Sequence, residues 1–272
     1  MKFKSIFIVL NTTLLLFLVI LVTLPLFIMN TLFFAPFWQG SWPFILFLIF
    51  ILCAFNTFYF TNRELFLLLE KEDWPALVRY LEGRVIQKGR YSPRLVRLLA
   101  NTYLVLSDSA AVMSLENKTA VAKPSLIDAN ALVFGTARIL GKDIAGAVRF
   151  FELRKDKVKG ELKEWVRWYL GFALLLDRQF ERAAGEFSIL ARVSKDGIIA
   201  GLSSYFLHGS IARALPEKEP EFRDISSQGS ERVLKALPRL KDWEQESSKL
   251  STEIHVAVLS KHMQEAGHWL YE

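Results

Sequence analysis

The 272-residue sequence is poor in the side chains that form disulfide bonds and metal sites. Its one cysteine, Cys53, excludes a disulfide framework and any metal site built from several cysteines. Among its four histidines, His255 and His262 lie seven residues apart, which is about 10 Å along a helix. A chelating pair on a helix needs a spacing of four. We therefore expect neither a metal site nor a cofactor.

Charge is almost absent from the first 62 residues. No Asp or Glu precedes Glu64, and the only basic residues before it are Lys2, Lys4 and Arg63 at the boundary. The 210 residues from Arg63 onward carry 32 Lys or Arg and 28 Asp or Glu side chains, a balance typical of a soluble domain. The overall hydrophobic share of 52% and the net charge of +6 therefore average two unlike parts.

Two long uncharged runs occupy the N-terminal part. Residues 5–28 would form a helix of about 36 Å, which can cross a hydrocarbon core of about 30 Å, and residues 42–61 are just long enough. Pro36 and Gly40, in the segment 29–41 between them, favour a tight turn. The sequence thus predicts a transmembrane hairpin in residues 1–62. The alternative, a cleaved signal peptide, fits less well because the first run is too long and no A-x-A-like cleavage site follows it.

Basic residues flank the two runs on one side only. Lys2 and Lys4 precede the first run, Arg63 and Lys71 follow the second, and the connecting segment has none. By the positive-inside rule, both termini are expected in the cytoplasm.

One polar residue in each run lies at a matching depth. Asn11 follows Lys4 by seven residues, and Asn56 precedes Arg63 by seven. In an antiparallel hairpin the two amides could form an interhelical hydrogen bond. The alternative is that each asparagine bonds locally near the lipid headgroups.

The rest of the chain repeats itself with a period of about 35 residues. Asp73, Asp108 and Asp143 are 35 residues apart, and Gln179 follows 36 residues later. Each opens a stretch whose apolar residues recur at helical spacing, and Asp is a favourable N-cap. Each unit is therefore predicted to be a helix, a turn and a second helix.

Two aligned columns combine small and aromatic residues. Gly135 and Gly171 lie in the first helix of their units, and Phe151 and Phe187 lie in the second. A small residue lets the paired helix approach closely. A single pair cannot bury its apolar face alone, so neighbouring pairs are expected to stack into a solenoid.

These units resemble the tetratricopeptide repeat family. The best match is WVRWYLGFALLLDRQFERAAGEFSILA, with Leu170-Gly171, Phe180, Ala183 and Phe187 at the family's positions. The unit at 99–124 is degenerate, because Ala100 replaces the glycine and Glu116 replaces the aromatic residue, and the first helix of the 65–88 unit directly continues the second span. With the hairpin, the whole chain also resembles bacterial membrane proteins in which two N-terminal spans precede such repeats. The expected fold is therefore all-α, a transmembrane hairpin followed by an α-solenoid, and the resemblance implies a bacterial inner membrane as the location. An ordinary helical domain with Asp caps recurring by chance is the alternative.

The predicted boundaries follow from these patterns. The helical repeats extend over 63–215, and a linker rich in charge, Pro and Ser covers 216–230. Residues 231–272 are expected to form C-terminal capping helices, with a short helix near 230–237 and a one-faced helix over 241–270.

Tetratricopeptide domains bind segments of other proteins in a concave groove lined mainly by the first helix of each pair. The resemblance thus implies a scaffold or adaptor at the membrane, with Arg97, Asn101, Arg138 and Arg167 as groove candidates. The alternative is an accessory subunit of a transport or secretion assembly in which the hairpin is the working part.

A basic cluster follows the second span. Basic residues near a membrane attract anionic lipids, each contributing about 1 kcal/mol close to the surface. A solvated helical face that also sets the topology is an equally good explanation. The lipid-headgroup candidates are Arg79, Arg84, Lys88, Arg90 and Arg94.

No catalytic motif is present in the sequence. It contains no G-x-x-x-x-G-K-[ST], no G-x-G-x-x-G after a strand and no G-x-S-x-G. We therefore do not expect an enzyme. Nucleic-acid binding is not expected either, because the basic excess is small and no recognised binding module is present.

Overall fold

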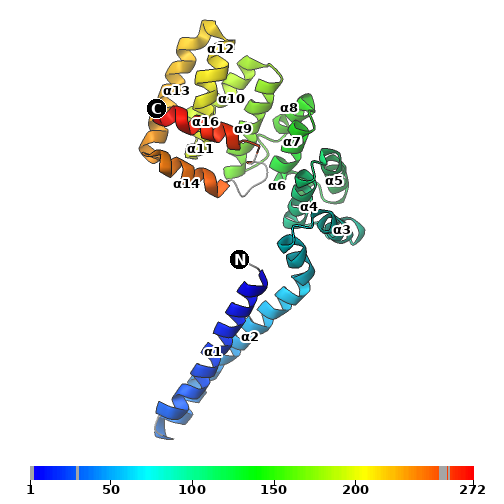
Figure 1. Ribbon diagram of the computed structural model, residues 1–272, viewed down its shortest axis with the longest axis vertical. Helices are drawn as coiled ribbons and strands as arrows, with labels where there is room; N and C mark the ends of the chain where they lie inside the picture. Colours follow the sequence, from blue (N-terminus) through cyan, green and yellow to red (C-terminus); the bar gives the residue numbers. More distant parts are fainter. Residues whose placement is uncertain (1–2, 29–30, 251–255, 257) are drawn as a thin grey trace. The chain divides into compact units, whose positions relative to one another are not determined.

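The computed structural model describes residues 3–28, 31–250, 256 and 258–272, and within those ranges every regular element is helical (Figure 1). The predictions for Lys2 and His255 lie outside the described residues. The chain divides into two compact units, Met1–Tyr80 and Leu81–Glu272.

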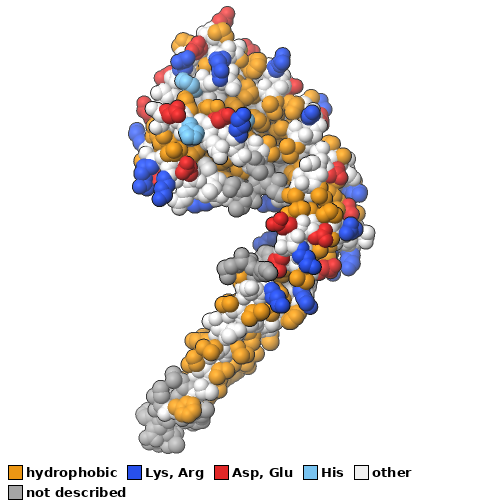
Figure 2. All heavy atoms as spheres, viewed as in Figure 1, with side chains coloured by type: hydrophobic (Ala, Val, Ile, Leu, Met, Phe, Trp, Pro, Cys, Tyr) orange, Lys and Arg blue, Asp and Glu red, His pale blue; other side chains and the backbone are white. Residues whose placement is uncertain are grey.

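The first unit is built on two long apolar helices. α1 is Phe3–Ile28 and α2 is Thr31–Glu70, and the two contact each other. Their most apolar segments, Lys4–Thr23 and Phe37–Glu70, have mean hydropathies of 2.7 and 2.2. Many apolar side chains of α1 and α2 are exposed, and Figure 2 shows them along the hairpin. By length and composition, both helices can cross a membrane.

The predicted turn at 29–41 is wrong for most of its length. Residues 31–41 belong to α2, so Pro36 and Gly40 lie inside a helix. Apolar helices tolerate both residues, because neighbouring groups can satisfy the backbone atoms that proline frees. At its other end α2 continues past the predicted span to Glu70, through the first helix of the 65–88 unit.

The second unit begins with paired helices. α3 (Trp74–Glu82) crosses the unit boundary and continues into a short π-helical turn, η1 (Gly83–Gln87). The pairs are α4 (Pro93–Val105) with α5 (Ser109–Ala122), α7 (Ala131–Leu140) with α8 (Ile144–Glu152), and α9 (Glu161–Leu176) with α10 (Phe180–Val193), and the short α6 (Ser125–Ala129) precedes α7. The first helices α4, α7 and α9 are successive neighbours.

One turn geometry recurs at the spacing of the sequence repeat. In the described part of the chain, four non-glycine residues have a positive φ: 52° at Glu72, 58° at Ser107, 62° at Lys142 and 59° at Arg178. Each lies one residue before the Asp or Gln that opens a repeat unit. The backbone N–H of that next residue bonds to the carbonyl five residues earlier, as in a Schellman motif.

The residue after each positive φ then starts the second helix. The Asp108 carboxylate accepts the Ala111 N–H at 2.8 Å, and the Asp143 carboxylate accepts the Gly146 N–H at 3.0 Å. The Asp73 carboxylate accepts the Ala76 N–H at 3.1 Å in the same way, so the Asp caps predicted from the sequence are confirmed at all three positions. Gln179 makes no such bond, so the last turn relies on the backbone alone.

Lys142→Gly should raise the free energy of unfolding by about 1 kcal/mol. Lys142 is exposed, and its Cβ is the group that disfavours a left-handed backbone. Lys142→Ala is the matched control and should give little or no gain, because alanine keeps the Cβ. Thermal unfolding of the full chain in detergent measures both. Equal gains for Gly and Ala would show that the side chain, rather than the backbone, carries the effect.

Glycine and phenylalanine face each other within two of the pairs. A Cβ added at Gly135 would lie 2.1 Å from the Phe151 ring, and one added at Gly171 would lie 2.9 Å from the Phe187 ring. Both phenylalanines are fully buried. The close approach expected from the two sequence columns is therefore present in the structure.

The predicted linker 216–230 is wrong. The segment forms a 3₁₀ turn, η3 (Pro216–Lys218), and most of α13 (Glu219–Ala236), which also contains the predicted short helix near 230–237. Pro216 and Pro220 are each tolerated because they lie in the first turn of a helix. Phe222, Ile225 and Val233 are buried at helical spacing, a pattern that the charged residues between them hide.

Tertiary contacts hold α13 in place. It packs on α10 and on α11 (Gly197–Phe206), which continues into the π-helical turn η2 (Leu207–Ile211) and α12 (Ala212–Ala214). Arg232 donates to the carbonyls of Ala191, at 2.9 Å, and Ser194, at 2.8 Å. These are the carbonyls that the end of α10 leaves without intrahelical partners.

The C-terminal stretch forms two helices rather than the single helix predicted over 241–270. α14 is Leu240–Leu250 and α16 is Ser260–Tyr271, and they pack together. Trp243 is 2% exposed, and its indole N–H donates to the Met263 carbonyl at 3.0 Å. The packing of α14 on α16 around this tryptophan is not revealed by helical periodicity alone.

Candidate functional site

The three first helices of the pairs line a hollow of about 350 Å³. α4 contributes Arg97 and Asn101, α7 contributes Leu132 and Val133, and α9 contributes residues from its first two turns. The hollow therefore lies on the face where α4, α7 and α9 are neighbours. We call it the first-helix groove; its lining is Arg97, Asn101, Ala129, Asn130, Leu132, Val133, Glu161, Leu162, Trp165 and Leu250.

A second hollow extends the groove along α4. Pro93, Arg94 and Leu98 line it together with Arg97 and Asn101, which belong to both hollows. Ser92 accepts the Leu95 N–H at 3.3 Å and caps α4, with Pro93 at the first helical position. The cap fixes the start of the helix, so Arg94, Arg97 and Asn101 follow each other along one side of it.

The Arg97 guanidinium has a hydrogen bond to a backbone carbonyl but no nearby carboxylate among the described residues. Its Nη2 donates to the Ala129 carbonyl at 3.1 Å, at the end of α6. In the described part of the chain no carboxylate lies within 4.0 Å of Arg94 or Arg97, and both side chains are exposed. The α4 side of the groove therefore carries positive charge that the described residues do not neutralise.

Asn130 is the most buried polar residue of the groove lining, at 2% exposure. Its side-chain N–H donates to the Leu126 carbonyl at 2.9 Å, while its Oδ1 has no hydrogen-bond partner among the described residues. A buried acceptor without a partner costs about 1–3 kcal/mol. A ligand N–H in the groove could remove that cost.

Arg138, the third predicted groove residue, does not line the groove. Its Nη1 pairs with Glu116 of α5 at 2.5 Å, and its guanidinium lies 4.5 Å from the centre of the Phe150 ring. Glu116 is 8% exposed. The pair explains why this repeat has a carboxylate where two other units have Phe151 and Phe187: the glutamate side chain reaches an arginine of the next pair.

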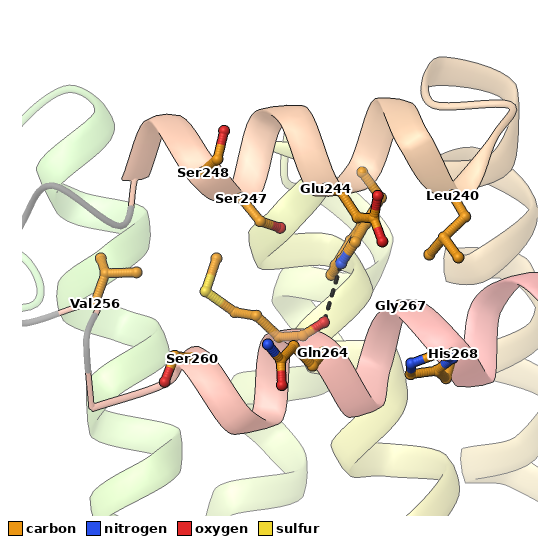
Figure 3. A pocket seen from close by; sticks show the side chains of 11 residues that line it. Leu240, Glu244, Ser247, Ser248, Val256, Ser260, Gln264, Gly267 and His268 are labelled. Carbon is orange, nitrogen blue, oxygen red and sulfur yellow. Dashed lines mark hydrogen bonds between the residues drawn. The ribbon is translucent and has the colours of Figure 1, made fainter.

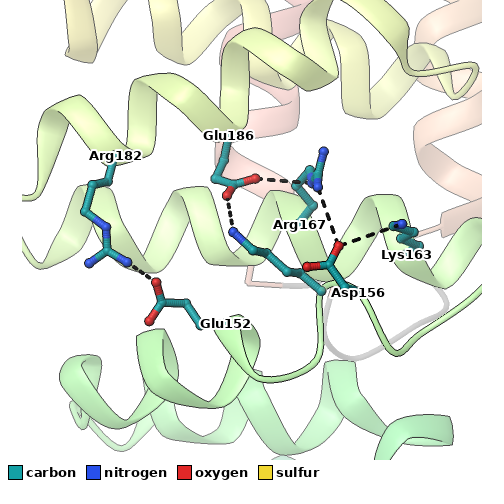
Figure 4. A network of polar contacts seen from close by, with 7 residues as sticks. Glu152, Asp156, Lys163, Arg167, Arg182 and Glu186 are labelled. Atoms are coloured by element: carbon teal, nitrogen blue, oxygen red, sulfur yellow. Dashed lines mark hydrogen bonds and ion pairs between the residues drawn. The ribbon is translucent and has the colours of Figure 1, made fainter.

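Arg167, the fourth candidate, belongs to a network of charges at α9 and α10 (Figure 4). Its Nε lies 3.2 Å from a Glu186 carboxylate oxygen, and Lys155 reaches the other oxygen of Glu186 at 2.8 Å. Asp156 joins Arg167 to Lys163, with separations of 4.0 and 3.9 Å. Arg182 pairs separately with Glu152. These pairs link neighbouring helices, so Arg167 is already engaged within the fold.

The lipid-headgroup candidates divide between the two units. Arg79 is exposed in the first unit, and Lys88, Arg90 and Arg94 are exposed in the second, where Arg84 is partly buried in η1. No acidic residue occurs between Gly83 and Ser107. The basic stretch of the second unit therefore includes the arginines that border the groove.

The Asn11 and Asn56 side chains meet in the first unit. Asn56 Nδ2 donates to Asn11 Oδ1 at 2.7 Å, and each Nδ2 also donates to a carbonyl of its own helix four residues earlier. Phe7 stacks on Tyr59 beside them, with ring centres 3.7 Å apart. The local and the interhelical hydrogen bonds of the two asparagines thus coexist. Together they reduce the free-energy cost of placing two amide groups in an apolar hairpin.

A further hollow of about 340 Å³ lies between α14 and α16 (Figure 3). Its lining includes Trp243 and Met263 together with Glu244, Ser247, Gln264 and His268. This hollow could not be predicted from the sequence, because its shape depends on how α14 and α16 pack. Trp165 and Asn130 of the first-helix groove were missed for a different reason: both are buried, and neither stands out in the sequence as a surface residue.

The groove and helices define an all-helical protein with two apolar helices that can cross a membrane. Residues 111–272 match the family described as "Uncharacterised Treponema protein", and the chain belongs to this family. It is also 29% identical over 243 residues to an uncharacterized protein of Treponema pallidum (strain Nichols), covering 86% of this chain and 77% of that protein. No solved structure matches.

Proposed function

We propose that this protein is a membrane-anchored, tetratricopeptide-like scaffold that binds segments of partner proteins. The observation that carries the proposal is the first-helix groove, since a surface formed by successive first helices can hold an extended chain. The 35-residue recurrence of the positive-φ turns and the Gly–Phe contacts between paired helices support the repeat interpretation. The proposal includes no catalytic activity.

The proposal also includes a location. The hairpin of α1 and α2 anchors the protein in a bacterial inner membrane, with both termini in the cytoplasm, and the basic residues next to the spans support this orientation. The helical unit then meets its partners at the cytoplasmic face. Access to a C-terminal tag from outside intact cells would contradict this topology.

Position-specific photo-crosslinking in cells tests the function. A photo-reactive amino acid is placed at Asn101 in the groove, at Val121 on α5, or at Phe50 on α2; Val121 is 88% exposed and Phe50 is 69% exposed. We expect discrete crosslinked proteins from Asn101 that are absent from Val121. Identical products from these two positions would contradict the groove. Products from Phe50 alone would instead favour the alternative, a transport or secretion subunit that works through its hairpin.

A further inference from the structure

The arginines on the α4 side of the groove differ from other arginines of the same unit in their acidic partners. Arg138, Arg167 and Arg182 each have a carboxylate within 4.0 Å. Arg94 and Arg97 have none in the described part of the chain, although both are exposed along the same hollow. Two unneutralised guanidinium groups in one hollow favour a ligand with carboxylates, which guanidinium binds in a bidentate manner.

The middle of the groove offers amide groups. Asn101 and Asn130 both line it, and Asn130 Oδ1 is buried without a partner among the described residues. An asparagine side chain presents one acceptor and two donors, which match the N–H and C=O of an extended main chain. This part of the groove is suited to a peptide backbone.

The far end of the groove, at α7 and α9, carries several apolar side chains and one exposed carboxylate, Glu161 at the start of α9. Trp165 is 6% exposed, Val133 is 4% and Leu132 is 8%, and Leu162 and Leu250 complete this end. Neighbouring packed helices are about 8–10 Å apart, so α4 and α9 are separated by about 16–20 Å. An extended chain rises about 3.3 Å per residue and needs about five or six residues to cover that distance.

We propose that the first-helix groove binds an extended acidic peptide segment, with two carboxylate side chains at Arg94 and Arg97 and a large apolar side chain about five or six residues away at Trp165. This inference rests on the proposed function and specifies the chemistry of the partner. A protein segment is favoured over a lipid headgroup because the groove continues from the arginines past two amides, of which Asn130 is buried, to the apolar side chains around Trp165. A headgroup would use only the charged end.

Selection from a random ten-residue peptide library against the full chain in detergent micelles tests the proposal. We expect enriched peptides to carry two Asp or Glu residues and a large apolar residue at the stated spacing. The double variant Arg94→Glu/Arg97→Glu should bind the strongest of these peptides at least about tenfold more weakly, and selection against it should enrich Lys and Arg instead. The matched control is Lys118→Glu/Arg149→Glu, which reverses two exposed charges on the second helices α5 and α8 and should keep the original affinity.

The outcomes separate the two claims. If no peptide is enriched by the unaltered chain, both the proposed function and this inference fail. If peptides are enriched without acidic residues, or bind the Arg94→Glu/Arg97→Glu variant equally well, the inference fails and the scaffold function stands. Loss of co-purifying anionic lipid together with unchanged peptide affinity would assign the two arginines to the membrane and overturn the inference. Arg94→Gln/Arg97→Gln, which removes the charges without reversing them, should lower the affinity in the same direction.

Discussion

Glu116→Ala should lower the free energy of unfolding by about 3 kcal/mol. The Glu116 carboxylate is 8% exposed and pairs with Arg138 at 2.5 Å, and the Arg138 side chain is itself 17% exposed. Removing one member of a buried pair leaves the other charge poorly solvated, which typically costs about 3–5 kcal/mol. We take the lower end of that range because Arg138 keeps some contact with water. Urea unfolding followed by tryptophan fluorescence measures the change.

The double variant Glu116→Leu/Arg138→Met separates the cost of the orphaned charge from the value of the pair. It removes both charges and keeps most of the side-chain volume, so its stability should lie within about 1–2 kcal/mol of the original protein. Arg138→Met by itself should be clearly less stable than the double variant, because it leaves the glutamate unpaired. A double variant as unstable as Glu116→Ala would show that the pair itself, rather than an unpaired charge, stabilises the contact between α5 and α7.

Gly135→Ala should lower the free energy of unfolding by about 2 kcal/mol. The new methyl group would lie 2.1 Å from the Phe151 ring, which is fully buried against Tyr169 and cannot move into solvent. Overpacking of this kind costs about 1–3 kcal/mol, more than the helix propensity that alanine adds. Thermal unfolding of the full chain tests it.

Gly185→Ala is the matched control for this prediction. Gly185 also lies within a helix, α10, but a Cβ there meets nothing within 4 Å. Its replacement should therefore stabilise the protein by about 0.5–1 kcal/mol through helix propensity alone. The paired change Gly135→Ala/Phe151→Leu should recover part of the lost stability, since a smaller partner makes room for the methyl group. Equal effects at Gly135 and Gly185 would show that the close Gly–Phe approach does not limit packing.

Local sequence signals predicted the parts of the fold whose physical cause is local. A helix cap needs a side-chain acceptor at a definite position, so Asp73, Asp108 and Asp143 could be assigned from their spacing. The positive φ that precedes each cap could not be read in the same way. At Ser107, Lys142 and Arg178 the turn is built without the glycine that usually indicates it.

In the segment 216–230, by contrast, local sequence signals led to a wrong prediction. Its charges and prolines are typical of a linker, yet Phe222 and Ile225 are buried in α13, and Arg232 further along the same helix caps the end of α10. Whether a mildly amphipathic segment becomes a docked helix depends on whether a matching surface exists. That surface is formed by α10 and α11, which are distant in the sequence from the residues they bury.

Only two of the four predicted groove residues line the groove, for a related reason. Arg97 and Asn101 line the first-helix groove, whereas Arg138 and Arg167 bind carboxylates of Glu116 and Glu186. All four are polar residues of first helices, and nothing in the spacing along the chain shows which arginine has an acidic neighbour. The partners come from other helices.

The sequence by itself determined the nearly uncharged N-terminal segment, the repeat period and the positions of the caps, because hydrophobicity, helical spacing and capping act over a few residues. Only the tertiary structure decided which groove arginines pair with carboxylates, that 219–236 is a helix, and that α14 and α16 pack around Trp243. Each of these depends on contacts between elements that are far apart along the chain, where burial and charge pairing outweigh local preference.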